Sequence, residues 1–336
     1  PVDCSGRFKM STYFWRFDMR ALSTLLLFAS TLFAQNPSLL QHFDYDQKAP
    51  LDIREAGVEQ RGDVAIHDIS YASPKGGRVP AYLVVPKGKG PFAAVIWGHW
   101  YQDGSEFRNR KEFLEEAVAL APVGVVSLLT DSPIARPGYV AAKDPLDESQ
   151  ITYRVQTILD MRRGADLLLA RDDVDAKRLA YVGHSYNAAT GAFLAGIEKR
   201  FKAFVLMAGN LSDEVDRKSK EFQDFRTQAG EQKVDAFVAK YSWLDQGKYV
   251  PYATPAMVFL QYATQEDFLT PERAWAYYAL VSSPKNLKFY DAPHALNAEA
   301  RRERVAFLVR QLTLKEPDAA AIARIPELVQ PPATQK

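Results

Sequence analysis

The stretch RLAYVGHSYNAATGAFLAGI, residues 178–197, decides the fold. Its first part, residues 178–182, ends in a short apolar run that predicts a buried strand. Residues 187–197 are small and apolar and predict a helix. Only the residues around Ser185 separate the two elements, so the sequence predicts a strand, a sharp turn and a helix in direct succession.

Outward from this segment, short apolar runs alternate with helical patterns on both sides. Apolar runs of this kind are typical of parallel strands that are buried on both faces by helices. The sequence therefore predicts an α/β fold with a mostly parallel central sheet flanked by helices. The other predicted strands are 92–97, 123–129, 203–208, 256–262 and 286–290, and the other predicted helices are 108–120, 149–171, 271–281 and 296–313.

Three segments lie outside this alternation. Residues 64–71 and 79–86 are β-rich runs separated by a Pro and Gly turn, so they predict an N-terminal antiparallel hairpin. Residues 210–253 are highly charged but also aromatic, which predicts a helical insertion, either a lid over a pocket or a solvated excursion. We expect one α/β domain over 35–314 and a loosely attached C-terminal tail over 315–336.

The N-terminal residues 1–34 have the pattern of upstream residues followed by a signal peptide. From Met19 the chain reads MRALSTLLLFASTLFA, one arginine and then an apolar run over 21–34. That run is shorter than the roughly 20 residues that a membrane-crossing helix needs. We therefore expect an exported protein, periplasmic or extracellular, with no stable membrane span; the alternative is a buried amphipathic helix.

Composition excludes several classes of partner and cofactor. The 42 Lys and Arg residues nearly balance the 41 Asp and Glu residues, and a net charge of +1 argues against a nucleic-acid binder. Cys4 is the only cysteine, which excludes an intrachain disulfide and a cysteine-ligated zinc site. We expect no metal and no organic cofactor.

Ser185 is the candidate nucleophile. A serine on a sharp strand-to-helix turn forms a nucleophile elbow, which presents its hydroxyl beside the helix N-terminus. Gly183 and Ala188 supply the small side chains that such a tight turn needs, although Asn187 stands where the G-x-S-x-G pattern has its last glycine. Alone, the match is as consistent with an ordinary turn and an N-capping serine.

A carboxylate and a histidine follow later strands in the order that this architecture requires. Glu266 and Asp267 follow the next-to-last predicted strand, and His294 follows the last. We expect these strands and that of Ser185 to be neighbours in the sheet. Asp267 is the favoured acid, with Glu266 as the alternative, because Asp267 is the last carboxylate before the helix that Pro271 opens.

The loop after the strand 92–97 is the expected source of a second oxyanion donor. We expect the backbone N–H of Tyr101, with Trp100 as second choice, to join that of Tyr186 in the oxyanion hole. His99 is interpreted as a brace for this loop. Trp100 and Trp243 are the expected walls of a substrate pocket for aromatic or extended apolar groups.

With these residues in place, the chain resembles the α/β-hydrolases, and within them the serine-type dienelactone-hydrolase-like and acyl-peptidase-like group. The resemblance covers residues 64–313. It implies the α/β-hydrolase fold and carries the triad to Ser185, Asp267 and His294, with Tyr101 and Tyr186 at the oxyanion positions. The matching motifs are DVDAKRLAYVGHS at 173–185, DFLTP at 267–271 and APH at 292–294.

Three functions are compatible with these residues. The leading hypothesis is an exported serine hydrolase that cleaves small carboxylic esters through an acyl-enzyme intermediate. The sequence gives no indication of its oligomeric state. A peptidase or an acyltransferase would use the same triad. The third is a non-catalytic binding protein on a hydrolase scaffold, which Asn187 and Trp100, both in place of glycines of the family pattern, would permit.

Overall fold

The computed structural model of the protein describes residues 37–209, 211–266 and 269–330. The chain divides into two compact units, Pro1–Pro37 and Ser38–Lys336, and the architecture described below is that of the second. The predicted signal peptide within residues 1–34 lies outside the described residues.

A nine-stranded sheet forms the centre of this unit, in the order β1-β2-β3-β5-β4-β6-β7-β8-β9. β1, β2, β3 and β5 pair antiparallel in that order, and all the other pairings, from β5–β4 to β8–β9, are parallel. The strands are β1 (Arg54–Arg61), β2 (Val64–Ala72), β3 (Arg78–Pro86), β4 (Phe92–Gly98), β5 (Val125–Thr130), β6 (Val174–His184), β7 (Ala203–Met207), β8 (Met257–Ala263) and β9 (Lys285–Tyr290).

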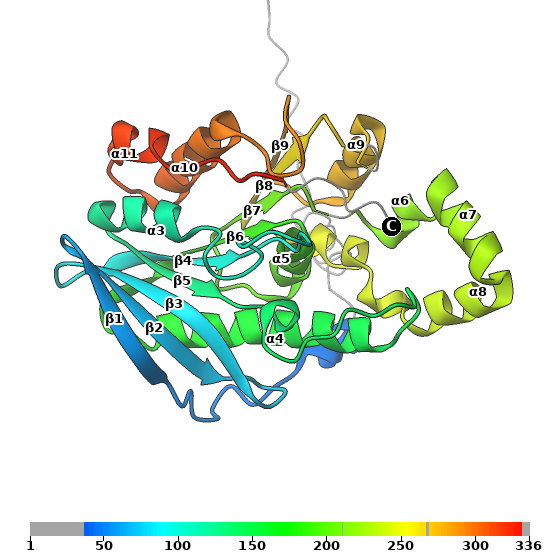
Figure 1. Cartoon of the computed structure of the whole chain (residues 1–336), viewed down its shortest axis with the longest axis horizontal. Helices are drawn as coiled ribbons and strands as arrows, with labels where there is room; N and C mark the ends of the chain where they lie inside the picture. The colour runs from blue at the N-terminus through cyan, green and yellow to red at the C-terminus, as the bar shows by residue number, and fades with distance from the viewer. Residues whose placement is uncertain (1–36, 210, 267–268, 331–336) are drawn as a thin grey trace, which may run out of the picture. The chain divides into compact units, whose positions relative to one another are not determined.

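Helices cover both faces of the sheet, because the strand side chains point alternately to two separate apolar cores. Ile96 belongs to the core that α4 and α5 cover, and its neighbour Val95 to the core that α3, α10 and α11 cover (Figure 1). The α-helices are α2 (Pro37–Leu40), α3 (Leu114–Leu120), α4 (Ser149–Leu169), α5 (Tyr186–Ile197), α6 (Asp213–Asp216), α7 (Lys220–Ala229), α8 (Glu231–Lys240), α9 (Pro271–Leu280), α10 (Ala298–Leu312) and α11 (Ala319–Ala323). Within the described ranges, none of them combines the length and apolar character needed to cross a bilayer.

The predicted α/β architecture is confirmed, including the N-terminal hairpin, which β2 and β3 form. Two elements differ from the prediction. β1 was not predicted, because its sequence REAGVEQR is charged and almost fully exposed, without the alternation that marks a half-buried strand. The helix predicted at 108–120 begins only at Leu114, since Asp131 accepts a hydrogen bond from the backbone N–H of Arg110 and holds the preceding residues in turns.

The C-terminal ends of β6, β8 and β9 lie on the same side of the sheet, because these strands are parallel. The sequence predicted that they would be direct neighbours, which holds for β8 and β9. β7 lies between β6 and β8, so the loop after β7 also reaches this side. That loop leads into the 210–253 insertion, where α6, α7 and α8 form the predicted helices (Figure 1).

The C-terminal segment is attached more firmly than the sequence predicted. α11 buries Ile322, which is 5% exposed, in the core shared with α3 and α10. Arg301 on α10 donates hydrogen bonds of 2.5 and 2.7 Å to the carbonyl oxygens of Ile325 and Pro326. One apolar side chain and two charged hydrogen bonds thus hold the segment 315–330, for which the sequence analysis expected a loose attachment.

Replacing Ile322 by Ala should release this segment. Loss of the buried side chain lowers the free energy of opening this segment by about 2 kcal/mol or more. Where cleavage depends on the population of the open segment, this corresponds to a roughly 30-fold higher rate of cleavage. Limited proteolysis followed by mass spectrometry measures cleavage within 315–330. Ala323→Gln, on the exposed side of the same helix, is the control and should cleave like the wild type. Equal cleavage of the Ile322→Ala variant would contradict the anchoring role.

Candidate active site

Ser185 occupies a strained turn between β6 and α5. Its backbone has φ 53° and ψ −110°, outside the regions that residues other than glycine normally adopt. The turn is so tight that a Cβ atom on Gly183 would lie 2.3 Å from the carbonyl oxygen of Asn187. Ser185 donates its backbone N–H to the carbonyl oxygen of Met207, 2.7 Å away. This is the geometry expected of a nucleophile elbow.

Asn187, which departs from the glycine of the family pattern, joins the elbow to two loops. Its Nδ2 donates to the carbonyl oxygen of His99 at 2.6 Å and to Oγ of Ser132 at 2.9 Å. Its own carbonyl oxygen accepts from the Tyr181 hydroxyl at 2.8 Å. The side chain is fully buried, so these bonds satisfy an amide that would otherwise be costly to bury.

His294 lies in the loop after β9 and faces a carboxylate from the loop after β8. Its Nδ1 is 2.9 Å from Oε2 of Glu266, and both side chains are at least nine-tenths buried. The favoured acid, Asp267, lies outside the described residues, so its assignment stays a prediction. Glu266, the alternative, is the carboxylate that the structure places on His294.

Three stacked rings connect this histidine to the elbow. The ring centroid of His184, the residue before Ser185, lies 5.3 Å from that of His294. Trp100 stacks on both imidazoles, with centroid distances of 5.2 Å to His184 and 6.3 Å to His294. His184 Nε2 is also 2.9 Å from the backbone carbonyl oxygen of His294. The structure thus brings His294 into contact with the residue adjacent to Ser185.

Glu112, which the sequence analysis did not single out, lies at the centre of these contacts. Its Oε1 is 2.6 Å from Nδ1 of His184, and its Oε2 accepts the backbone N–H of Trp100 at 2.5 Å. The side chains of Glu112 and His184 are both 0% exposed. The carboxylate therefore contacts both the loop after β4, which carries Trp100, and the elbow.

This contact bears on the choice of oxyanion donors. The N–H of Trp100, the second choice from the sequence, is occupied by Glu112. Within the described ranges, the backbone N–H groups of Tyr101 and Tyr186 have no protein acceptor. The assignment of those two groups to the oxyanion hole stays a prediction.

His99 braces the loop that carries Trp100 and Tyr101. Its Nδ1 donates to the carbonyl oxygen of Trp100 at 2.7 Å, and its Nε2 accepts the backbone N–H of Ser132 at 3.0 Å. One donating and one accepting nitrogen define a neutral imidazole. Burial accordingly lowers the pKa of His99 to about 4. This matches the bracing role interpreted from the sequence.

Arg154 of α4 holds the first residue of α5. Its Nη1 donates to the carbonyl oxygen of Tyr186 at 2.6 Å and to Oγ1 of Thr190 at 2.9 Å. The guanidinium carbon lies 3.7 Å from the centroid of the Tyr186 ring. The cation–π contact and the charged hydrogen bonds together fix the residue that follows Ser185. Arg154 was not predicted from the sequence.

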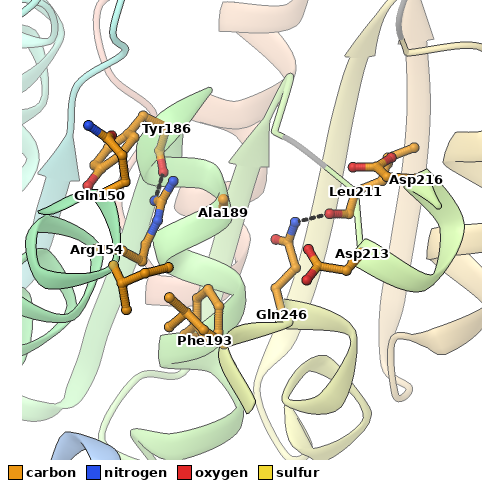
Figure 2. Close-up of a pocket in the computed structure, with 11 residues that line it drawn as sticks. Gln150, Arg154, Tyr186, Ala189, Phe193, Leu211, Asp213, Asp216 and Gln246 are labelled. Atoms are coloured by element: carbon orange, nitrogen blue, oxygen red, sulfur yellow. Dashed lines mark hydrogen bonds between the residues drawn. The ribbon is translucent and has the colours of Figure 1, made fainter. Parts of the chain in front are cut away.

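A cavity of about 220 Å³ opens beside Tyr186. Figure 2 shows Arg154 and Tyr186 on one side and Asp213, Asp216 and Gln246 of the insertion on the other. The 210–253 insertion therefore forms one wall of a cavity next to the elbow. The complete lining is Gln150, Ile151, Arg154, Tyr186, Ala189, Phe193, Leu211, Asp213, Asp216, Leu244 and Gln246.

The two tryptophans predicted as pocket walls do not line this cavity. Trp100 is 0% exposed because it packs under the two imidazoles. Trp243 stacks on His42 with a centroid distance of 3.8 Å and contacts Phe43 edge-on. It therefore holds these two residues against the insertion. The cavity instead combines apolar residues of α5 with charged and amide side chains. In the described part of the chain, no group of His, Cys, Asp and Glu side chains has an arrangement that would hold a metal ion.

Comparison with protein-family models gives no match, and comparison with curated proteins gives none. Solved structures do match. An acetyl xylan esterase from Paenibacillus sp. R4 aligns with a TM-score of 0.64 and 20% identity, over 82% of this chain and 92% of that one. Acetyl xylan esterase 1 from Thermoanaerobacterium sp. JW/SL YS485 gives 0.65 and 17%, over 81% and 92%. A glucuronoyl esterase from Solibacter usitatus gives 0.54 and 14%, over 82% and 91%.

At these identities the likeness is one of fold. The sheet order, the elbow after β6 and the solved neighbours together establish that the chain has the α/β-hydrolase fold. The resemblance predicted from the elbow and the two later loops is confirmed at that level.

The low pKa of His99 predicts a specific loss of stability in acid. Below the ordinary pKa of 6.5, His99 becomes protonated in the unfolded chain, whereas in the folded chain it stays neutral down to about pH 4. Stability therefore falls as pH decreases through this window, by about 3 kcal/mol from this residue. Urea unfolding across the window should give a flatter curve for His99→Gln, whose amide oxygen can still accept from Ser132. Identical pH dependence in both proteins would contradict a neutral, buried His99.

Proposed function

We propose that this protein hydrolyses carboxylic esters, with Ser185 as nucleophile and His294 as general base. The observation that carries the proposal is the buried pair of His294 and Glu266. The imidazole of His294 packs against that of His184, which directly precedes Ser185 in the elbow. A serine hydroxyl becomes an effective nucleophile only when a base removes its proton, and a carboxylate on Nδ1 prepares that base. The solved esterases that share the fold support the same reaction class.

The proposed reaction uses these groups in two steps. Oγ of Ser185 attacks the acyl carbon while Nε2 of His294 accepts the hydroxyl proton. The backbone N–H groups of Tyr186 and Tyr101 bind the oxyanion of the tetrahedral intermediate. Collapse breaks the bond to the alcohol, which leaves with the proton from His294. Water then attacks the acyl-enzyme by the same route and releases the acid.

We assign the role of the acid to Glu266. Its Oε2 is within hydrogen-bond distance of Nδ1, and its side chain is 2% exposed, so little water competes for the contact. A buried carboxylate in this position fixes the imidazole orientation and stabilises the imidazolium that forms during acylation. Asp267 remains the competing assignment because the two residues are adjacent in one loop.

The cavity beside Tyr186 would hold part of the substrate. Ala189 and Phe193 give it an apolar floor, whereas Asp213 and Gln246 bring polar groups from the insertion. This mixed lining favours a short group that carries polar substituents over a long apolar chain. In this role the 210–253 insertion is a specificity wall. We also propose that the protein is exported, on the basis of the signal-peptide pattern before residue 35.

Ser185→Ala should abolish turnover of p-nitrophenyl acetate, with a loss of at least about 10³-fold in kcat, because no other group supplies the nucleophile. A fluorophosphonate probe should label the wild type at Ser185, as identified by peptide mass spectrometry, and should not label the variant. The same rate in both proteins, or a wild type that the probe leaves unlabelled, would refute the esterase proposal.

Glu266→Gln and Asp267→Asn form a matched pair that identifies the acid. If Glu266 orients His294, its replacement should lower kcat by about 10²- to 10⁴-fold, since the wrong tautomer is then favoured. Asp267→Asn should stay close to the wild type in the same ester assay. The opposite ranking would return the role to Asp267 and overturn the assignment of Glu266.

A further inference from the structure

Glu112 and His184 form a second buried acid–histidine pair beside the one proposed for catalysis. In the proposed triad, Glu266 contacts the imidazole of His294. In the second pair, Glu112 contacts the imidazole of His184, and the other nitrogen of that ring reaches the backbone carbonyl oxygen of His294. The two pairs are stacked, with 5.3 Å between the imidazole centroids.

The hydrogen positions in the second pair follow from its partners. A carbonyl oxygen only accepts, so Nε2 of His184 must carry the hydrogen that is donated to His294. One further proton lies between Nδ1 of His184 and Oε1 of Glu112, either on the imidazole or on the carboxyl group. In both cases the pair is neutral overall, which is how two ionisable side chains that are 0% exposed can be buried together.

Three parts of the proposed active site depend on this pair. Glu112 holds the N–H of Trp100, next to the predicted oxyanion donor Tyr101. His184 is part of the elbow itself. His184 also supports the backbone of His294, while Trp100 stacks on both histidine rings. Glu112 is therefore linked to the oxyanion loop, the nucleophile turn and the base.

We propose that Glu112 and His184 are positioning residues for ester hydrolysis, which fix the imidazole of His294 and the oxyanion loop relative to Ser185. The proposal rests on the esterase function proposed above. Neither residue touches the reacting atoms. Their contribution is geometric, because small displacements of a base or an oxyanion donor reduce the rate of the chemical step and leave ground-state binding largely unchanged.

A second buried ion pair provides an internal comparison. Glu116 of α3, four residues after Glu112 in the sequence, accepts hydrogen bonds of 2.9 and 2.6 Å from Arg304, and both side chains are almost fully buried. This pair joins α3 to α10, and within the described residues neither side chain forms a hydrogen bond or ion pair with Ser185, His294 or Tyr101. Its removal should therefore affect stability without affecting the chemical step.

Two substitutions of His184 separate positioning from stability. The amide nitrogen of Asn can replace Nδ1 and keep the bond to Glu112, but it cannot reach the carbonyl oxygen of His294. The amide of Gln can replace Nε2 and keep the bond to His294, but it leaves the Glu112 carboxylate without its histidine. Both variants remove the ring, so stacking is lost equally.

The experiment measures kcat and KM for p-nitrophenyl acetate, the rate of fluorophosphonate labelling, and urea unfolding, all on the full chain. His184→Asn should lower kcat by about 10- to 100-fold with little change in KM. His184→Gln should retain more of kcat, although it should be the less stable of the two because it leaves a buried charge unpaired. The orders of activity and of stability are thus opposite, which a purely structural role does not predict.

Substitutions of the carboxylate complete the test. Glu112→Ala should behave like His184→Asn, whereas Glu112→Gln should recover most of the wild-type kcat. Its amide oxygen can accept from Trp100, and its amide nitrogen can donate to Nδ1 of a neutral His184. Glu116→Gln, the matched control, should lower stability and leave kcat unchanged.

Three outcomes would overturn the positioning role. These are equal kcat values for the two His184 variants, a kcat that simply follows stability across the series, and an effect of Glu116→Gln on kcat equal to that of Glu112→Ala. Failure of the esterase proposal is a different result, because the wild type itself would then show no turnover that depends on Ser185.

Discussion

The backbone turn at Ser185 is the constraint on which the rest of the site depends. A residue other than glycine at φ 53° costs of order 1–3 kcal/mol, and such a conformation persists only where its surroundings hold it. Here the Ser185 N–H is tied to Met207 of the next strand, and Tyr181 is tied to the carbonyl oxygen of Asn187. The sheet thus fixes the turn from both sides. The hydroxyl of Ser185 is presented at the sheet edge because β6 cannot continue past it.

The two departures from the family pattern are linked through the oxyanion loop. The Asn187 side chain donates to the carbonyl oxygen of His99, the residue before Trp100, and the Trp100 ring fills the space under the two histidines. Glycine at either position would give a more flexible loop, with no side chain to hold it. This chain has hydrogen bonds and ring packing at the same places. The departures are consequently compatible with an ordered loop after β4.

Most of the fold was predictable because the relevant patterns are local. The apolar run before Gly183 and the long helix α4 are each recognisable from the pattern of a few neighbouring residues. The ends of α4 were predicted to within two residues. Glu112 was not predictable in the same way. It lies in the charged run RNRKEFLEE, which has the composition of a solvated surface, and only the tertiary structure shows that it is buried. The acid presented a similar difficulty, since the geometry of one loop decides between the adjacent residues Glu266 and Asp267.

The arrangement of the two acid–histidine pairs also bears on charge. In the proposed mechanism His294 becomes an imidazolium during acylation, and its ring centroid lies 5.3 Å from that of His184. If His184 carried an uncompensated charge, the repulsion at this distance would be about 3 kcal/mol at an effective dielectric constant of about 20. That penalty would oppose the very step that the base performs. Glu112 removes it, because the carboxyl group and His184 share their proton within a neutral pair. A neutral His184 without Glu112 would also avoid the repulsion, but it would leave Trp100 without its acceptor. The carboxylate is the group that meets both requirements, which explains why a charged side chain is buried at this point.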